Sequence, residues 1–285
     1  NELKIKLDND DLGKAFFSLL KDGINGLRLV DFSDINNNSY VVVTELPYES
    51  GDDSFRPDIT ILINGMPLSF VEVKRQNNRE GILVERERMT RRFSNRIYRR
   101  YVNITQYTVF SNNNEYDDTD IEPIQGAFYA SSNYGKMFFS KFREQRKEEL
   151  GRSLSSIDDE TELFILKDTN LLSIKGTPEY KSSIREDSPT NRIVTSLYAK
   201  ERIMFLLQYG ICYKETTDKN GIRHIEKHIM RYPQMFATMA IRDRLDEGIK
   251  KGIIWHTQGS GKTALAYSNV LYLRDYFQKQ GKIAK

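Results

Sequence analysis

The sequence contains very little cysteine and histidine and no long apolar run. One cysteine, Cys212, and three histidines occur among its 285 residues. A single cysteine excludes an internal disulfide framework and is typical of a reducing cytosol, so we expect a cytoplasmic protein. The three histidines lack the partner cysteines of a zinc site. No stretch approaches the ~18 consecutive apolar residues of a membrane-spanning helix, so we expect no membrane partner.

Positive and negative charges are nearly balanced, which excludes a general polycation. Lys and Arg number 43, Asp and Glu number 40, and the formal net charge is +3. One segment departs from this balance. Residues 72–100 contain four acids and ten bases, namely Lys74, Arg75, Arg79, Arg86, Arg88, Arg91, Arg92, Arg96, Arg99 and Arg100. This segment is a candidate surface for nucleic-acid phosphates. The alternative is a solvated helix whose arginines pair with neighbouring glutamates.

The pattern of apolar residues predicts an α/β protein. Before a charged stretch at 144–162, which is the expected domain boundary, it predicts helices over 10–23 and 80–101 and strands at 39–46, 58–63, 66–74 and 106–111. After that stretch it predicts a helix over 187–207, a largely helical segment over 225–249, a short buried strand at 252–256 and a helix over 262–277.

The register of the expected hairpin 58–74 decides whether two carboxylates meet. A strict two-residue turn at Asn64-Gly65 turns Asp58 away from Glu72. A three-residue loop, or a two-residue loop with a bulge, pairs Ile63 with Pro67 and places Asp58 opposite Glu72. We expect this second register, because Pro67 lacks an N–H and favours an irregular turn. Both faces of the hairpin are apolar near the turn, so both are expected to be covered.

In that register Asp58, Glu72 and Lys74 converge at the open end of the hairpin. Two carboxylates close together repel each other unless a cation lies between them, and Mg²⁺ prefers oxygen ligands. An ion held by Asp58, Glu72 and the carbonyl of Val73 would polarise a phosphodiester and activate a bound water. Lys74 would position or deprotonate that water, or stabilise the developing charge. The alternative is an exposed strand with alternating charges.

Residues 256–263, His-Thr-Gln-Gly-Ser-Gly-Lys-Thr, form a loop between an expected strand and an expected helix. Backbone N–H groups of such a loop, with the helix N-terminus, bind phosphate. Lys262 would reach the β- and γ-phosphates, and the Thr263 hydroxyl would bind Mg²⁺. ATP and Mg²⁺ are thus the expected cofactors, and the loop residues predicted to bind nucleotide are Thr257, Gly259, Ser260, Gly261, Lys262 and Thr263. The alternative is an ordinary glycine-rich turn.

A second nucleotide-binding element precedes this loop. The sequence Arg231-Tyr232-Pro233-Gln234 resembles the glutamine motif with which superfamily 2 helicases read adenine. The resemblance implies that Gln234 hydrogen-bonds adenine and that Arg231 lies nearby.

The longer strings around the carboxylates carry a further resemblance. Arg56-Pro57-Asp58-Ile59-Thr60-Ile61-Leu62-Ile63-Asn64-Gly65-Met66-Pro67-Leu68 and Val71-Glu72-Val73-Lys74-Arg75 resemble the nuclease domain of the R subunit of type I restriction-modification enzymes, within the Asp…Glu-x-Lys nuclease superfamily. The phosphate loop and glutamine motif resemble the opening of the first RecA-like motor domain of the same subunit. By this resemblance Asp58 and Glu72 are metal ligands and Lys74 is the catalytic lysine. The Gln-x-x-x-Tyr element that often follows in the family has no clear counterpart here.

The resemblance implies a mixed-sheet, restriction-endonuclease-like nuclease domain flanked by helices (1–150), a helical connecting region (151–224) and the beginning of a RecA-like P-loop domain (225–285). The implied function is Mg²⁺-dependent cleavage of unmodified foreign duplex DNA after ATP-driven translocation. The implied partners are duplex DNA and the methyltransferase (modification) and specificity subunits. No Asp-Glu pair follows the phosphate-loop helix, so we expect an N-terminal fragment that does not translocate DNA by itself. The alternatives are an ATP-dependent helicase-nuclease of DNA repair and a non-catalytic module that binds DNA or a partner.

Overall fold

The structure is a computed structural model that describes residues 2–50, 53–78, 80–117, 119 and 125–283. Within these residues the main sheet has six strands in the order β1-β4-β5-β6-β7-β8. Strands β5 and β6 are parallel, and the other neighbouring pairs are antiparallel. Two-stranded sheets are formed by β2 with β3 and by β9 with β10. The strands are β1 (Tyr40–Thr44), β2 (Tyr48–Ser50), β3 (Asp53–Phe55), β4 (Ile59–Ile63), β5 (Met66–Val73), β6 (Tyr107–Ser111), β7 (Ala127–Ser131), β8 (Ser140–Lys141), β9 (Ile211–Thr217) and β10 (Arg223–Ile229).

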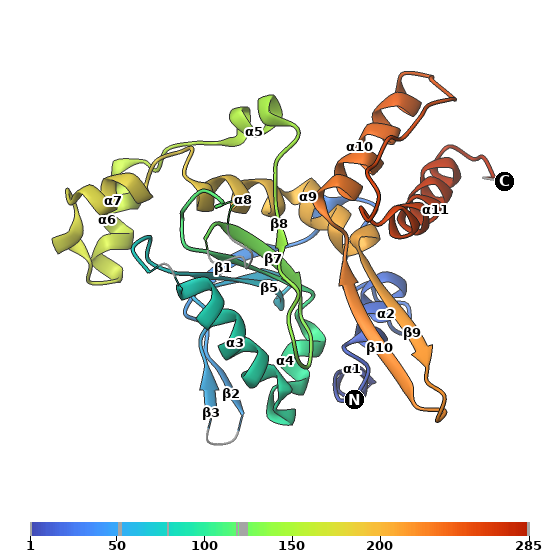
Figure 1. The fold of residues 1–285 in the computed structure, drawn as a ribbon, viewed down its shortest axis with the longest axis horizontal. Helices are drawn as coiled ribbons and strands as arrows, with labels where there is room; N and C mark the ends of the chain where they lie inside the picture. Colours follow the sequence, from blue (N-terminus) through green and yellow to red (C-terminus); the bar gives the residue numbers. More distant parts are fainter. Residues whose placement is uncertain (1, 51–52, 79, 118, 120–124, 284–285) are drawn as a thin grey trace.

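Helices surround this sheet, which confirms the predicted α/β class with a mixed sheet (Figure 1). The segment with α6 and α7 extends from one end of the molecule, and α10 and α11 lie at the other (Figure 1). None of the described helices is both long enough and apolar enough to cross a membrane. The helices are α1 (Glu2–Leu7), α2 (Lys14–Asp22), η1 (Ile35–Asn37), α3 (Gly81–Ser94), η2 (Arg96–Tyr98), α4 (Arg99–Ile104), α5 (Lys147–Ser153), α6 (Asp159–Asp168), η3 (Leu172–Ile174), α7 (Pro178–Ser183), α8 (Pro189–Tyr198), α9 (Lys200–Phe205), the π-helical η4 (Leu206–Gly210), α10 (Tyr232–Asp246) and α11 (Lys262–Lys279).

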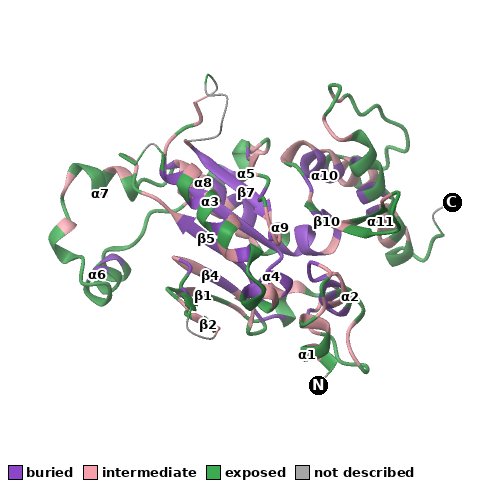
Figure 2. Cartoon of the chain, turned by 60° about the horizontal axis from the view of Figure 1, so that its bottom comes forward, coloured by how far each residue is buried: buried purple, intermediate pink, exposed green. Residues whose placement is uncertain are grey.

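The central strands are buried on both faces, as predicted for the hairpin (Figure 2). On one face Phe70 of β5 and Phe110 of β6 pack with side chains of α3, η2 and α4. On the other face Val71 and Val109 pack with α2, α8 and α9. Neighbouring residues of one strand therefore enter different cores, because successive side chains of a strand point to opposite faces.

The register of the β4–β5 hairpin combines features of both predicted alternatives. Ile63 pairs with Met66, as in a strict two-residue turn, so the predicted pairing with Pro67 is wrong. The pairing then shifts by one residue, since Leu62 faces Pro67 and Ile61 faces Ser69. The extra residue, a β-bulge, gives the pairing of Ile59 with Val71, and the same register continued by one residue places Asp58 opposite Glu72. A bulge was one of the two predicted ways to reach this register, and its position between Ile61 and Leu62 was not predicted.

Two predicted helices are shorter than expected. The first begins at Lys14 instead of Asp10, because Leu12 and Gly13 have positive φ angles. Asp11 still caps it, accepting hydrogen bonds from the backbone N–H groups of Gly13 and Ala15 at 3.0 and 2.9 Å. The Arg-rich helix ends at Ser94, where extended Asn95 caps the following 3₁₀ turn and accepts a hydrogen bond from Ile97 N–H.

Two predictions near the C-terminus are wrong. Residues 225–229 belong to β10, which pairs with β9 to form an antiparallel hairpin. The predicted buried strand at 252–256 is a loop in which Ile253 and Trp255 are 92% and 90% exposed. None of the described strands pairs with it, and an isolated extended segment has no partner for its backbone groups.

The β9–β10 hairpin ties the C-terminal part of the chain to the main sheet. Lys227 is buried, and its Nζ donates to the Thr105 carbonyl and the Ser132 hydroxyl, each at 2.8 Å. Burial holds the pKa of this lysine well below its usual range. The Tyr129 hydroxyl donates to the Met230 carbonyl at 3.0 Å.

One apolar core includes residues from all three predicted domains, among them Val71, Leu197, Met235 and Tyr272. The domain boundaries stay a prediction.

Candidate active site

The three side chains predicted to act on DNA lie at one end of the β4–β5 hairpin. Asp58 immediately precedes β4, and Glu72 and Lys74 lie at the end of β5. The Val73 backbone N–H donates to Asp58 Oδ2 at 2.6 Å, which fixes the aspartate beside this end of β5. Lys74 Nζ lies 3.2 Å from Glu72 Oε2. The bulge thus produces the predicted convergence of these residues.

Glu72 is the most unusual group of this cluster, because it is a carboxylate with only 1% of its surface exposed. Its Oε2 contacts Lys74, but its Oε1 is buried and has no hydrogen-bond partner in the described part of the chain. Burial raises the pKa of Glu72 to about 7, and the negative charges of Asp58 and Glu85 contribute to this shift.

Two further members of the cluster are Glu85 and Arg88 of α3; sequence reasoning assigned no role to Glu85 and placed Arg88 only in the basic segment. Glu85 is 2% exposed, and its Oε2 lies 3.0 Å from Lys74 Nζ. Arg88 donates to Glu85 Oε1 through Nε at 2.9 Å, and its second nitrogen lies 2.8 Å from the same oxygen. The available signal was the spacing of Ile82, Glu85 and Met89, which places a glutamate in the apolar stripe of the helix.

Lys74 is held in its charged form by two acids. Burial by itself would lower the pKa of this lysine, but the charges of Glu72 and Glu85 outweigh burial and raise it above its usual range. In this conformation Lys74 is therefore a charged donor that can orient a water or stabilise an anionic group.

The raised pKa of Glu72 predicts an unusual pH dependence of stability in the absence of divalent cations. The folded protein retains the Glu72 proton up to about pH 7, whereas the usual value is 4.5. Stability is therefore lost as the pH rises across this window, by about 3 kcal/mol at ~1.4 kcal/mol per pH unit. Urea unfolding of the wild type and Glu72→Gln at pH 5 and pH 8, with a chelator present, measures this. The glutamine variant should lose less stability over this range, and parallel curves would contradict the raised pKa.

The donor set is compatible with a magnesium ion. Mg²⁺ is usually bound by one or two carboxylates and several waters, and here two carboxylates lie beside the backbone of Val73. The buried Oε1 of Glu72 has no hydrogen-bond partner among the described residues, so this oxygen can serve as a ligand to a cation. The described residues contain no group of three or more His, Cys, Asp or Glu side chains that could hold a metal ion. A site here would therefore depend on two carboxylates, a backbone carbonyl and water.

The predicted phosphate loop precedes helix α11, as expected, although its preceding strand is absent. The first two residues of the helix, Lys262 and Thr263, are exposed. Thr257 and Gly259 of the loop are exposed as well. Gly261 has φ +81°, a left-handed conformation that favours glycine. A Cβ at Gly261 would lie 2.3 Å from the Gln234 amide nitrogen, so glycine is also required by space.

Gln234 is buried against this loop. Its Nε2 donates to the carbonyls of Gly261 at 3.0 Å and Ser260 at 3.3 Å, and its Oε1 accepts from the Arg231 backbone N–H at 2.8 Å. Both ends of the amide are therefore engaged within the protein in this conformation. Gln234 thus lies beside Arg231 and contacts the loop. Adenine reading by Gln234 stays a prediction, and it requires this amide to exchange partners.

The basic segment is divided between internal contacts and the surface. Arg96 and Arg99 pair with Asp10, Arg100 pairs with Asp8, and Arg92 stacks over the ring of Phe55. Arg75 and Arg91 are exposed, and Arg79 lies outside the described residues. The segment thus contributes both to folding and to surface charge.

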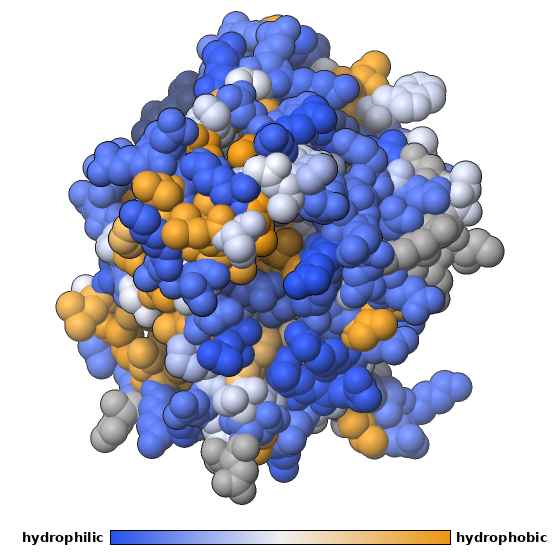
Figure 3. Space-filling view, turned by 90° about the vertical axis from the view of Figure 1, so that its left-hand side faces the viewer, coloured by the Kyte–Doolittle hydropathy of each residue, from blue (hydrophilic) through white to orange (hydrophobic). Residues whose placement is uncertain are grey.

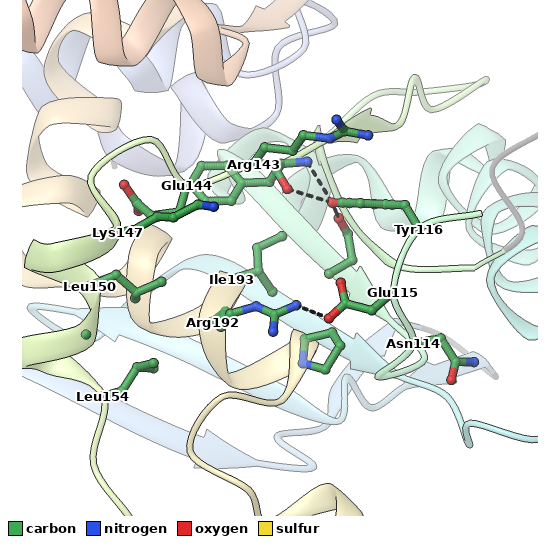
Figure 4. A pocket seen from close by; sticks show the side chains of 14 residues that line it. Asn114, Glu115, Tyr116, Arg143, Glu144, Lys147, Leu150, Leu154, Arg192 and Ile193 are labelled. Atoms are coloured by element: carbon green, nitrogen blue, oxygen red, sulfur yellow. Dashed lines mark hydrogen bonds and ion pairs between the residues drawn. The ribbon is translucent and has the colours of Figure 1, made fainter. Parts of the chain in front are cut away.

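A separate cavity of about 590 Å³ lies between the loop after β6 and helices α5 and α8 (Figure 4). Arg192 and Glu115 form an ion pair of 2.5 Å in it. Asp58, Glu72 and Lys74 are not among its lining residues. Figure 3 views the molecule from the end with α6 and α7, where hydrophobic residues reach the surface. Phe164 of α6 is 69% exposed.

Comparisons with known proteins agree with the two motifs. Residues 1–118 match the family described as type I restriction enzyme R protein N terminus, and residues 233–283 match the SWI2/SNF2 ATPase family. Two relatives from Methanocaldococcus jannaschii are named as endonuclease subunits of the type I restriction enzymes MjaVIIP and MjaVIIIP. The first is 24% identical over 263 residues, covering 88% of this chain and 20% of the relative. The second is 22% identical over 296 residues, covering 97% of this chain and 23% of the relative.

The chain therefore spans about a fifth of the length of these relatives. The predicted resemblance is confirmed: residues 1–118 are similar to the N terminus of type I restriction enzyme R proteins, and residues 233–283 are similar to the SWI2/SNF2 ATPase family.

Proposed function

We propose that this chain contributes the nuclease site and the start of the ATP-driven motor of a type I restriction endonuclease. The enzyme would act in the cytoplasm, together with methyltransferase and specificity subunits, and would cleave unmodified foreign duplex DNA. The names of the relatives favour this function over a helicase-nuclease of DNA repair. The observation that carries the nuclease proposal is the buried, unpartnered Oε1 of Glu72 beside Asp58 and Lys74.

The residues of the hairpin would have different roles in catalysis. Asp58, Glu72 and the Val73 carbonyl would hold Mg²⁺, which polarises the phosphodiester and lowers the pKa of a bound water. Lys74 would orient that water and stabilise the charge that develops on the phosphate. Exposed arginines such as Arg75 and Arg91 would contact the DNA backbone, to which they contribute affinity without sequence specificity.

The C-terminal part would bind ATP through the N-terminus of α11. Its first backbone N–H groups have no acceptor within the helix, and this end of a helix favours anions. Lys262 and Thr263 are exposed there and can reach phosphates and Mg²⁺. We infer that hydrolysis and translocation need further elements of the motor, such as an arginine finger.

Metal binding by the chain tests the nuclease proposal. Titration calorimetry with Mn²⁺ should show a site that Asp58→Ala and Glu72→Ala each weaken by about tenfold or more, because each removes a charged ligand. Glu87→Ala, which removes an exposed carboxylate of α3, is the matched control and should bind like the wild type. Equal affinity in all four proteins would contradict a metal site at the hairpin and favour a non-catalytic module.

A further inference from the structure

The two buried glutamates of the cluster have different hydrogen-bonding roles. Both oxygens of Glu85 contact cationic side chains, Oε1 with Arg88 and Oε2 with Lys74. Glu72 shares Lys74 through Oε2, and its Oε1 has no partner. Arg88 lies 3.8 Å from Glu72, beyond hydrogen-bond distance. Glu72 is thus the carboxylate with free coordinating capacity, and Glu85 is already saturated.

Helix α3 holds Glu85 rigidly against the end of β5. Ile82, Met89 and Phe93, on the same face of the helix, are 0–1% exposed and fill the core over the sheet. The helix starts at Gly81, where an added Cβ would lie 3.2 Å from the Lys74 Cβ and 2.9 Å from the side chain of Asn78. A larger residue at position 81 would push the helix away from Lys74, so the close approach depends on this glycine.

We propose that Glu85, fixed by Arg88, is a positioning residue that holds Lys74 in place independently of Glu72, so that Glu72 can give up its contact with Lys74 to a divalent cation. This inference rests on the proposed nuclease function. It assigns the third carboxylate of the cluster to the lysine and not to the metal.

Charge explains why a second acid is needed. A cation beside Glu72 neutralises the charge that attracts Lys74 and repels the ammonium directly. Without Glu85, the flexible lysine would turn toward solvent, since its side chain is already 21% exposed. With Glu85 the ammonium keeps an ion pair whose carboxylate is held on its other side by the arginine fork.

Glu85→Gln in the assembled complex tests this role, because it removes the charge and keeps the shape. We expect plasmid nicking to fall by about 10- to 100-fold, as for the loss of other residues that orient a reacting group. Mn²⁺ affinity of the chain should not fall, whereas Glu72→Gln should weaken it. Glu87→Gln is the matched control, with the same chemical change on an exposed position of the same helix. Nicking at the wild-type rate, or a Mn²⁺ affinity that falls as much as in Glu72→Gln, would overturn the proposal.

A metal-free measurement separates this inference from the proposed function. Glu85→Gln should lower the melting temperature of the wild-type chain, because it leaves Lys74 and Arg88 with one acid. In the Lys74→Met background the same change should lower the melting temperature by less, because only the contact with Arg88 is then weakened and one of two mutually repelling carboxylates is removed. Equal shifts in both backgrounds would overturn the positioning role even if the metal site is real. Coupled shifts without Mn²⁺ binding would support the Glu85–Lys74 pair and contradict the nuclease proposal.

Discussion

We expect Lys74→Ala to abolish DNA cleavage by the assembled enzyme while ATP is hydrolysed at the wild-type rate. Loss of a positioned catalytic group costs about 10²–10⁴-fold in rate. Lys74 is the one cation within 3.2 Å of both buried glutamates among the described residues. Its removal therefore takes away the charge that would orient water and stabilise the phosphate, and Lys262, in the ATP site, is unchanged. The measurement is nicking of plasmid DNA beside ATP hydrolysis in the same samples.

The control must exclude misfolding, because Lys74→Ala also leaves two buried carboxylates with less compensation. Lys219→Ala removes an exposed lysine of the β9–β10 turn and should behave as the wild type in both assays. The unchanged ATPase rate reports that the variant is folded and assembled. Cleavage at the wild-type rate in Lys74→Ala would exclude it as the catalytic lysine.

The convergence of Asp58, Glu72 and Lys74 could be predicted because it depends on a short hairpin with a strong turn signal. The Asn64-Gly65 dipeptide fixes the turn, and alternation fixes the faces of each strand. The position of the bulge could not be predicted, since one extra residue anywhere between turn and carboxylates gives the same final pairing.

Glu85 was missed for a different reason. A glutamate four residues before Met89 and three before Arg88 reads as part of a solvated, salt-bridged helix. Only the tertiary structure shows that this face of α3 lies on β5, which buries the glutamate beside Lys74. The sequence signal was the place of Glu85 in the apolar stripe of the helix. Such a position indicates a buried charge, but it does not identify the residue that pairs with it.

The segment 252–256 was predicted to be buried and is largely exposed, whereas Glu85 has the spacing of an exposed, salt-bridged residue and is buried. Its apolar residues Ile253, Ile254 and Trp255 favour a buried strand by composition, yet all three are exposed. A strand is defined by its neighbours, and the described part of the chain offers no strand beside it. The following helix α11 forms as predicted, because helical hydrogen bonds lie within one segment.

Lys262→Ala is expected to remove ATP hydrolysis by the full-length enzyme and to leave metal binding at Asp58 and Glu72 unchanged. Removing a cation that stabilises phosphate charge in the transition state costs about 10²–10³-fold. Lys262 is exposed as the first residue of α11, so its truncation removes no buried packing. Cleavage that depends on translocation should be lost with hydrolysis, although the nuclease residues are intact.

The matched control is Lys279→Ala, which changes the same type of residue at the opposite end of the same helix. A cation there compensates the negative end of the helix dipole and is remote from the phosphate loop, so hydrolysis should persist. Lys74→Ala and Lys262→Ala together give a double dissociation: one loses cleavage and keeps hydrolysis, and the other loses hydrolysis and keeps Mn²⁺ binding. One apolar core contains residues of both β5 and α11, so loss of hydrolysis in Lys74→Ala, or loss of Mn²⁺ binding in Lys262→Ala, would indicate damage to that core and contradict two separable sites.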